Sequence, residues 1–496
     1  MPLHVTASAV LGLSLTVGAS ATVGTTASPP QTRETTTADF LARRMAESGV
    51  PGMAYAIVGA DGIHEMGAWG TDGDGDDVTT DTPFLWGSVS KPVTATAVMT
   101  LVEDGTVDLG EPVRTYLPAF RLADTDAARQ VTVRHLLTQT SGIPEGTGVT
   151  DRFGQDGDPY RSAVAGLADV EPKFAPGTRH EYASENYLVL GALVEAVSGM
   201  SYTRYLRENV LGPLDMDGAV TSPEGADQRL PAGHRYVAGQ AVAFDAPYDP
   251  TGPSYGYLGG TITDLAHFAV AQLAEGRYGD SRVLDAGTVS RMQQGTAHIS
   301  DTHCYGLGWR DDDRNTDLGT STVWHLGAAP GYQAGVVLLP EKELGIVVLQ
   351  NVYGFFQDSE LAAAQLGAAR ILAGGDPAER SGGAAYPALL AGLTVLVAAL
   401  AALTGWSLWR PRRDRHARSR ARLAITTVSW CVSCAAVAFA AGVLLPWSVG
   451  TDLGVMPLYA PDVAWLLVAV VITASALALT RLGVALVRWR RPRVAR

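Results

Sequence analysis

Ser88 and Lys91 are a pair of side chains whose types and spacing suit covalent chemistry. The apolar residues that follow, from Val93 to Leu101, have the spacing of a helix, and Pro92 is compatible only with the start of one. Residues three apart on a helix share a face, so the Lys91 amine reaches toward the Ser88 hydroxyl. An amine in that position can help to deprotonate the hydroxyl, which makes Ser88 a candidate nucleophile.

A Ser-x-x-Lys motif is short, and it needs support from the rest of the chain. The only lysines among the 496 residues are Lys91, Lys173 and Lys342, because arginine carries almost all of the positive charge. A lysine inside a motif is therefore more informative here than in an average sequence. Alone, the motif remains suggestive.

Six ordered segments extend the pattern: Phe84–Lys91, Leu101–Leu109, His135–Gly142, Pro176–Tyr182, Tyr305–Trp309 and His325–Gly327. Over about residues 38–372 the sequence resembles the serine hydrolases related to class C β-lactamases and D-alanyl-D-alanine carboxypeptidases, which are penicillin-binding-protein-like. The resemblance implies an α+β fold of the β-lactamase/transpeptidase type, with an antiparallel sheet flanked by helices and a helical subdomain. It also implies that Ser88 forms an acyl-enzyme.

The resemblance assigns Tyr182 the role of proton shuttle. The family's second motif is Tyr-x-Asn, and this chain has Tyr182-Ala183-Ser184 after a Pro-Gly-Thr turn. A tyrosine beside a lysine can have a lowered pKa, accept the proton of the serine and donate it to the leaving group. Ser184 departs from the family pattern at a substrate-binding position. Asn186, two residues on, is a candidate to supply the missing amide.

His325-Leu326-Gly327 stands where β-lactamases of this group have Lys-Thr-Gly, a replacement that resembles the family's esterases and peptidases. Lysine would be a permanent cation for a substrate carboxylate, whereas histidine, with an ordinary pKa of ~6.5, is mostly neutral and offers one hydrogen bond. We expect Gly327 to let the substrate lie close to the strand. By resemblance, the backbone N–H groups of Ser88 and Ala328 form the oxyanion hole, and neither a metal nor a cofactor is needed.

Two other groups of residues have side chains that can ligate metals. Asp72, Asp74 and Asp76 alternate as in a calcium loop, but the central glycine and the final glutamate of that motif are missing. A hairpin turn is therefore favoured there. The second group lacks the fourth ligand of a zinc site and lies beside the start of a strand: His298, His303 and Cys304. We predict no metal site.

The N-terminus has the composition of an export signal. The first 26 residues contain no Asp, Glu, Lys or Arg, and an apolar stretch is followed by small residues at 19–21. We predict a signal peptide, or an uncleaved anchor, over residues 1–21. Pro, Thr and Ser are frequent in the linker expected over residues 22–37.

The body, residues 38–372, is predicted to begin and end with secondary structure that shares one sheet. A helix over 38–48, capped by Thr37, is followed by a hairpin from residue 53 to 69. A helix over 358–372 closes the body. Consecutive strands are predicted before it, over residues 305–309, 321–325, 333–339 and 345–350.

Beyond a Gly- and Pro-rich linker over residues 373–387, three apolar segments are each long enough to cross ~30 Å of hydrocarbon as a helix. These segments are residues 388–409, 423–447 and 463–487. Seven arginines lie between residues 410 and 422, none between 448 and 462, and five from 488 to the end. The positive-inside rule then predicts a multi-pass protein of the cell membrane, with the body extracellular and the C-terminus cytoplasmic.

Charge divides the chain at the same place. Residues 1–380 contain 24 Lys and Arg against 47 Asp and Glu, whereas residues 381–496 contain 13 against 3, so the net charges are −23 and +10. An acidic body argues against a nucleic-acid partner, because binding to phosphates needs clustered Lys and Arg. The expected partners are a small-molecule or peptide substrate, for example one derived from the cell wall, and membrane lipid around the three helices.

Three functions remain open at this point. The first is an exported, membrane-tethered serine hydrolase that acts on an ester, a D-amino-acid peptide or a related amide. The second is a β-lactamase or D-Ala-D-Ala carboxypeptidase, which His325 and Ser184 make less favourable. The third is an inactive sensor or scaffold with the penicillin-recognising fold, and the retention of Ser88, Lys91 and Tyr182 argues against it.

Overall fold

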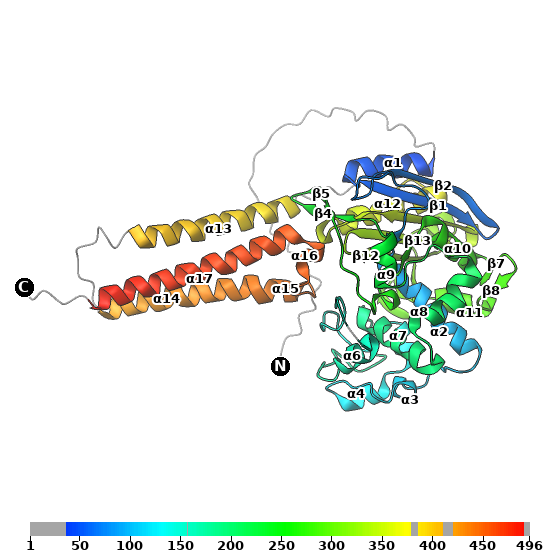
Figure 1. The fold of residues 1–496 in the computed structure, drawn as a ribbon, viewed down its shortest axis with the longest axis horizontal. Coiled ribbons are helices and arrows are strands. Elements are labelled where there is room, and N and C mark those ends of the chain that lie inside the picture. The colour runs from blue at the N-terminus through cyan, green and yellow to red at the C-terminus, as the bar shows by residue number, and fades with distance from the viewer. Residues whose placement is uncertain (1–35, 156, 378–384, 410–419, 491–496) are drawn as a thin grey trace, which may run out of the picture.

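The computed structural model of the protein describes residues 36–155, 157–377, 385–409 and 420–490. The predicted signal peptide and nearly all of the linker that follows it lie outside the described residues. The described residues form a mixed α and β body from which three long helices extend side by side (Figure 1).

An eight-stranded antiparallel sheet forms the centre of the body, with the strand order β2-β1-β14-β13-β12-β11-β10-β9. The N-terminal hairpin thus pairs with a C-terminal meander, and the prediction that both ends share one sheet is confirmed. The strands are β1 (Gly52–Gly59), β2 (Gly62–Gly70), β9 (Ala297–Ser300), β10 (His303–Tyr305), β11 (Arg310–Asp312), β12 (Thr322–Ala329), β13 (Tyr332–Leu339) and β14 (Leu344–Gln350). Shorter strands pair outside this sheet: β3 (Phe84–Leu85) with β6 (Gly259–Gly260), β7 (Arg277–Tyr278) with β8 (Ser281–Arg282), and β4 (Gly233–Val237) with β5 (Gln240–Phe244) and β15 (Val352–Tyr353).

Helices cover both faces of the sheet, which explains why central strands such as β1 and β13 are buried along their whole length. Alternate residues of β1 enter two different hydrophobic clusters: Ala54 and Ala56 face one, whereas Met53 and Tyr55 face the other. Helices α1 (Thr37–Ser48) and α12 (Asp358–Leu372) pack together on one face, and α10 (Ile262–Leu273) packs against β1 and β14 on the other.

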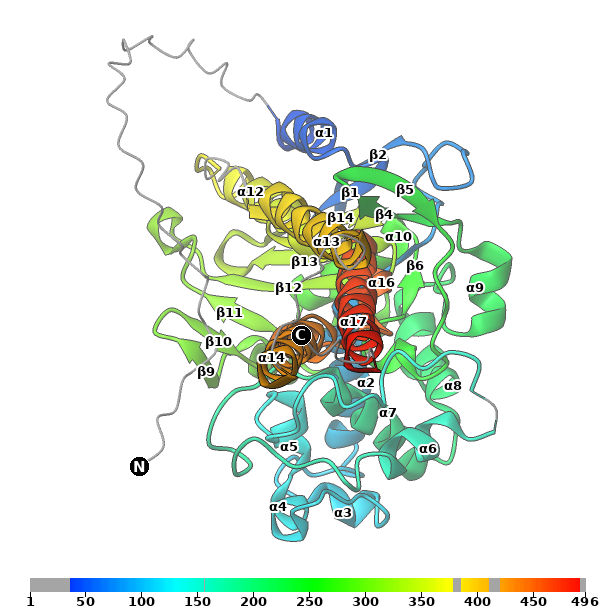
Figure 2. The same cartoon turned by 90° about the vertical axis from the view of Figure 1, so that its left-hand side faces the viewer.

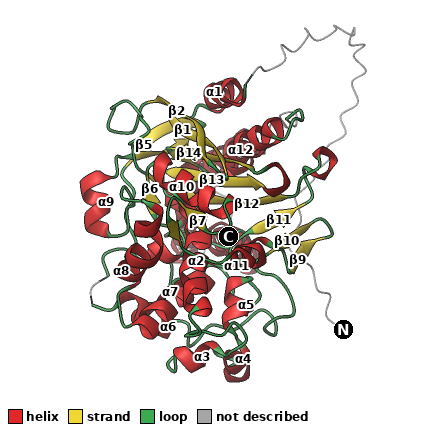
Figure 3. Cartoon of the chain, turned by 90° about the vertical axis from the view of Figure 1, so that its right-hand side faces the viewer, coloured by secondary structure: helices red, strands yellow, loops and turns green. Residues whose placement is uncertain are grey.

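A helical region lies below the sheet in the view of Figure 3 and begins with α2 (Ser90–Glu103). Its largest member is α7 (Ser184–Ser198), which contacts α2. The remaining helices of the body are α3 (Val113–Tyr116), α4 (Thr125–Gln130), α5 (Val133–Leu137), α6 (Pro159–Ala165), α8 (Tyr202–Leu206), α9 (Pro223–Arg229) and α11 (Ala286–Gln293). The predicted α+β class with a helical subdomain is confirmed.

The structure differs from the predicted elements at two points. Thr36, not Thr37, caps α1, because its Oγ1 accepts a hydrogen bond from the Asp39 backbone N–H at 3.0 Å. The strand predicted over residues 305–309 is wrong, since β10 ends at Tyr305 and β11 begins at Arg310. Gly308, with φ +89°, turns the chain between them, and a Cβ there would lie 2.8 Å from the Ala95 Cβ on α2.

The three C-terminal helices are long and apolar enough to cross a membrane. They span Ala385–Trp409 (α13), Arg420–Ser448 and Pro461–Arg490 (α17), with mean hydropathies of 2.2, 2.1 and 2.4 over their most apolar windows. The second contains α14 (Arg420–Phe439), a short π-helical segment (Ala440–Leu444) and α15 (Leu445–Ser448). Helix α17 contacts both α13 and α14, and Cys434 is buried among their apolar side chains.

The body lies against one end of this helix bundle, and the other end, where α13 ends and α14 begins, points away from it (Figures 1 and 2). The contacts involve the β4–β5 hairpin and the helix α16 (Met456–Tyr459). Arg235 donates to the Pro457 carbonyl at 3.1 Å, and the Ala238 backbone N–H donates to Asp462 at 2.7 Å. The same end of the bundle therefore carries the predicted outer loop and the body.

Candidate active site

Ser88 lies in a 3-10 turn over Gly87–Val89 that leads directly into α2. Gly87 has φ +53°, a conformation that favours glycine, so the turn depends on that residue. Pro92 is the third residue of α2, where it removes no helical hydrogen bond. Lys91 lies one turn after Ser88, and its Nζ is 2.9 Å from the Ser88 Oγ, as the spacing predicts.

The Lys91 amine is buried, with no exposed side-chain surface. Besides Ser88, its Nζ donates to the Tyr255 carbonyl at 2.8 Å and lies 3.4 Å from the Ser184 Oγ. Burial lowers the pKa of Lys91 to about 8, although the negative charges of Glu145 and Glu185 act in the opposite direction. A neutral amine is therefore accessible close to neutral pH.

Tyr182 lies beside this pair, with the Lys91 Nζ 4.8 Å from the centre of its ring. The predicted lowering of its pKa is wrong in direction. Burial raises the pKa of Tyr182, while a hydrogen bond with Ser88 and the charge of Arg310 act to lower it. The group with the lowered pKa is Lys91, so Tyr182 holds its proton in the resting site and is suited to donate it.

His325 is buried on β12, and both of its ring nitrogens are engaged within the protein. Its Nδ1 lies 2.8 Å from the Leu326 carbonyl, which only accepts, so Nδ1 carries the proton. Nε2 therefore accepts from the Tyr305 hydroxyl at 3.1 Å. Burial and the charges of Arg310 and Lys91 hold the pKa of His325 well below its usual range. The neutral ring holds Tyr305 against Tyr182, instead of offering the free hydrogen bond predicted for substrate.

Gly327 and Gly87 bring β12 into backbone contact with the nucleophile turn. A Cβ on Gly327 would lie 2.0 Å from the Trp86 carbonyl oxygen and 2.7 Å from the Ser88 nitrogen. A Cβ on Gly87 would lie 2.4 Å from the Ala328 nitrogen. The sequence predicts that Gly327 makes room for the substrate. In the structure Gly327 instead makes room for the turn that carries Ser88. The same approach places the two backbone nitrogens of the predicted oxyanion hole next to one another.

Ser184 and Asn186 have different positions from those that the sequence suggested. Ser184 faces the site itself, between Lys91 and Glu145, and its Oγ is 3.1 Å from Glu145 Oε1. Asn186 is buried away from it, where it accepts from Ser141 at 2.6 Å and donates to Gln139. Asn186 therefore does not replace the amide that Ser184 lacks.

Three further residues contribute to the site and were not found from the sequence. Glu145 contacts both the backbone and the side chain of Ser184. Arg310 lies over the Tyr182 ring at 5.4 Å from its centre, and Tyr255 supplies a carbonyl to Lys91. They come from two loops and from the start of β11, far apart in the chain, so no local spacing indicates them.

The two candidate metal groups take other roles. Asp72 accepts hydrogen bonds from the backbone N–H groups of Asp74 and Asp76, both at 3.0 Å, in a turn closed by a bridge between Thr71 and Asp77. Cys304 lies 3.3 Å from His298 across two strands. The described ranges contain no group of three or more His, Cys, Asp or Glu residues that could hold a metal ion.

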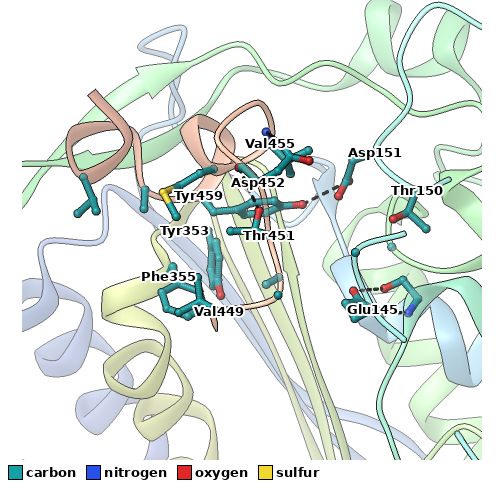
Figure 4. A pocket seen from close by; sticks show the side chains of 18 of the residues that line it. Glu145, Thr150, Asp151, Tyr353, Phe355, Val449, Thr451, Asp452, Val455 and Tyr459 are labelled. Atoms are coloured by element: carbon teal, nitrogen blue, oxygen red, sulfur yellow. Dashed lines mark hydrogen bonds between the residues drawn. The ribbon is translucent and has the colours of Figure 1, made fainter. Parts of the chain in front are cut away.

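A cavity of about 440 Å³ extends from the nucleophile to the helix bundle. Ser88, Tyr182 and Ala328 line it on the side of the body, and residues of α13, α16 and α17 line it on the other. Figure 4 shows Tyr459 of α16 and Asp151 pointing toward each other, joined by a hydrogen bond of 3.4 Å. Burial raises the pKa of Asp151 to about 6. The bundle therefore forms part of the wall of the candidate active site.

Comparison with known proteins shows the family to which this chain belongs. The sequence model of the Beta-lactamase family matches residues 37–370, which is more than half of the chain. The chain belongs to the beta-lactamase family. Penicillin-binding protein 4 of Amycolatopsis lactamdurans is 34% identical to it over 327 residues, which cover 63% of this chain and 84% of that protein. Protein flp of Staphylococcus aureus is 25% identical, and the match spans 53% of its length.

Two solved structures share the fold of the body. The octameric penicillin-binding protein homologue from Pyrococcus abyssi superimposes with a TM-score of 0.58 at 25% identity, over 69% of this chain and 77% of its own. A D-stereospecific amidohydrolase from Streptomyces sp. gives a TM-score of 0.54 at 22% identity, over 66% and 97%, which shows likeness of fold alone. Family membership confirms the resemblance inferred from the six sequence segments.

Proposed function

We propose that this protein is a membrane-tethered serine hydrolase that forms an acyl-enzyme on Ser88 and cleaves an ester, a D-amino-acid peptide or a related amide. One observation carries the proposal: the Lys91 Nζ is 2.9 Å from the Ser88 Oγ, in a buried setting that lowers the pKa of Lys91 to about 8. A neutral amine at hydrogen-bond distance is a suitable base for a serine nucleophile. The beta-lactamase family supports the reaction class.

In the acylation step, the Ser88 Oγ attacks the substrate carbonyl carbon, and its proton passes to the neutral Lys91 amine. The developing oxyanion accepts hydrogen bonds from the backbone N–H groups of Ser88 and Ala328. Tyr182, which is hydrogen-bonded to Ser88 and keeps its proton at neutral pH, donates that proton to the leaving group. The Lys91 ammonium restores the proton of Tyr182, so the resting charges return.

Deacylation uses the same groups. A water molecule gives a proton to the neutral Lys91 amine and attacks the acyl carbon. As the bond from that carbon to the Ser88 Oγ breaks, the Lys91 ammonium gives this proton to the Oγ, so Ser88 leaves as the hydroxyl. The products are the free acid and the original enzyme. Arg310 favours the transient phenolate of Tyr182, because its positive charge lies against that ring.

The position of the protein in the cell is part of the proposal. The end of α13, the start of α14 and the end of α17, which adjoin the arginine-rich parts of the sequence, lie at the end of the helix bundle that points away from the body. By the positive-inside rule that end is cytoplasmic, and the catalytic body is then outside the cell. The apolar, uncharged N-terminus supports export.

A β-lactamase or D-Ala-D-Ala carboxypeptidase is the second candidate, and the penicillin-binding names of its relatives favour it. Against it stands His325, because a buried neutral ring with both nitrogens engaged offers no cation to a substrate carboxylate. The third candidate is an inactive sensor or scaffold. Such a protein does not need the contact between the Lys91 amine and the Ser88 hydroxyl, which an enzyme uses.

Covalent labelling of Ser88 tests the proposal. We expect a fluorophosphonate probe to label the full-length protein once per chain, and Ser88→Ala to abolish the label while the thermal unfolding curve is retained. Ser300→Ala, which changes an exposed serine on β9, is the matched control and should be labelled normally. Labelling of Ser88→Ala at the stoichiometry of the unmodified protein would refute Ser88 as the nucleophile.

A substrate panel separates the enzyme candidates. The panel is a p-nitrophenyl ester, nitrocefin and a D-Ala-D-Ala peptide, each assayed with the unmodified protein and with Ser88→Ala. We expect Ser88-dependent turnover of the ester to exceed that of nitrocefin. Efficient turnover of nitrocefin or of the peptide would select the second candidate instead, and no Ser88-dependent turnover or labelling at all would select the third.

A further inference from the structure

The cavity above Ser88 does not end within the body. Its lining includes Leu389 and Leu393 of α13 and Val463 and Leu467 of α17, which belong to the same cavity as Ser88. In each pair the second residue lies one helical turn further along the helix, about 6 Å deeper at 1.5 Å per residue. The cavity therefore reaches from the nucleophile into the first turns of two membrane-spanning helices.

The part of the cavity between α13 and α17 offers no polar side chain to a peptide, and the polar lining residues Ser448, Thr451 and Asp452 belong to the end of α15 and the loop after it. All of the described lining residues that α13 and α17 contribute are apolar, namely the four named above. Polar groups buried there would lose their hydrogen bonds to water without gaining partners, and water itself is held poorly by an apolar cavity. A chain of methylene groups is the occupant that suits such walls.

Exposed aromatic side chains mark the level of the membrane surface beside the cavity. Phe355 and Phe356 both line it, and 46% and 37% of their surfaces are exposed. Phe356 stacks on Tyr386 at the start of α13, with ring centres 5.2 Å apart. Aromatic rings gather at the boundary between hydrocarbon and water, so this rim is suited to lie at the outer surface of the bilayer.

We propose that the substrate is an amphiphile of the outer leaflet, with its ester or amide at Ser88 and a linear alkyl chain between α13 and α17. This inference rests on the proposed hydrolase function and names the substrate class. The bundle is then part of the substrate site as well as an anchor. A membrane-embedded chain reaches Ser88 without leaving its apolar surroundings, which a soluble body alone would not provide.

The test uses the full-length protein in lipid nanodiscs and compares kcat/KM for p-nitrophenyl decanoate and p-nitrophenyl butyrate. Leu393→Trp and Leu389→Trp fill the far part of the cavity. The control is Val395→Trp, on the opposite side of α13, where 67% of the valine is exposed. Because substrate enters the bilayer equally in all variants, the ratio of the two kcat/KM values reports on the cavity.

We expect both leucine variants to lower the decanoate-to-butyrate ratio at least about tenfold relative to Val395→Trp. The loss of two buried methylenes at roughly fourfold each would give about sixteenfold, so about tenfold is a lower bound. Leu389 is 37% exposed, so its variant leaves the packing of the bundle largely intact and guards against misfolding. In a second series, kcat/KM is compared for decyl acetate and butyl acetate. In these esters the alkyl chain is part of the leaving group instead of the acyl group.

The outcomes are distinguishable. A fall in the ratio for both leucine variants in either series supports the alkyl-chain site. Unchanged ratios in both series, with hydrolysis of butyrate still dependent on Ser88, overturn this inference and leave the hydrolase function standing. Absence of any Ser88-dependent hydrolysis overturns the proposed function itself, and the substrate class with it.

Discussion

At the scale of single residues, the buried amine of Lys91 sets the pH range in which Ser88 can react. Its pKa falls to about 8 because burial disfavours the charged form more than Glu145 and Glu185 favour it. Tyr182 has the opposite shift, so the two groups divide the roles of base and acid between them. The resemblance predicts a lowered pKa for Tyr182. Burial instead raises the pKa of Tyr182 and lowers that of Lys91, because it disfavours the charged form of each group.

The first prediction at this scale concerns the pH dependence of turnover. Lys91 must be neutral to accept the Ser88 proton, so kcat/KM for p-nitrophenyl butyrate should rise with pH and level off above a midpoint of about 8. The measurement is a pH series corrected for spontaneous hydrolysis. A profile that is flat from pH 6 to 9 would contradict the assignment of Lys91 as the base.

A variant sharpens that prediction. Glu145 is the largest of the charges that raise the pKa of Lys91, so Glu145→Gln should move the midpoint to lower pH. Glu341→Gln, which alters a carboxylate bound by Thr320 and Ser321 just before the start of β12, is the matched control and should not move it. A shift to higher pH in Glu145→Gln would show that the charges around Lys91 have been misassigned.

At the scale of elements, the site depends on the close contact between β12 and the turn that carries Ser88. Two glycines make that contact, and each replaces a side chain that would collide with backbone atoms. The helix α2 is held from its other side by Gly308 in the turn between β10 and β11. The sheet thus positions Ser88 through direct backbone contacts, which only glycine allows at these positions.

The second prediction follows from this contact. Gly327→Ala inserts a Cβ 2.0 Å from the Trp86 carbonyl, so β12 and the nucleophile turn must separate. We expect kcat to fall by about 10²–10³, the cost of losing one oxyanion-hole donor. The unfolding free energy should fall by ~1–3 kcal/mol, as for other overpacked positions. Kinetics and denaturant unfolding measure the two effects.

The control for this variant is Gly345→Ala on β14, where a Cβ would lie 3.1 Å from flexible Leu338 and Val58 side-chain atoms. It should lose some stability and retain kcat. If Gly327→Ala keeps the kcat of the unmodified protein, the backbone of Ala328 does not take part in stabilising the oxyanion.

At the scale of the whole molecule, the body and the helix bundle share one cavity above Ser88, because residues of both line it. Asp151, in the loop that precedes α6, meets Tyr459 at the base of the bundle. The ends of the helices nearest the body are therefore adjacent to the candidate catalytic groups, and the orientation in the membrane decides which compartment the site faces.

The third prediction is the orientation. In intact cells, external protease should digest the body, whereas the 410–422 segment and a tag at the C-terminus should be protected until the membrane is permeabilised. Immunoblotting with antibodies to the body and to the tag measures both. A body that is protected in intact cells, together with a tag that is cleaved, would reverse the topology.

The sequence by itself determined the features that depend on local spacing and on runs of residues. Ser88 and Lys91 share a helical face, and three apolar segments with arginines at alternate ends predict membrane spans and their direction. The α+β class, the shared sheet and the helix over residues 358–372 also followed from periodicity. These features can be predicted without knowing which residues far apart in the chain are in contact.

Only the tertiary structure decided the features that depend on burial and on long-range contact. Both ring nitrogens of His325 form hydrogen bonds within the protein, and Asn186 is buried in the core. Glu145 lies close enough to Lys91 to raise its pKa, and Arg310 lies over the ring of Tyr182. The tertiary structure also joined the ends of the helices nearest the body to the candidate active-site cavity. A pKa and a cavity are properties of groups packed together in space, and a one-dimensional pattern does not contain the distances that set them.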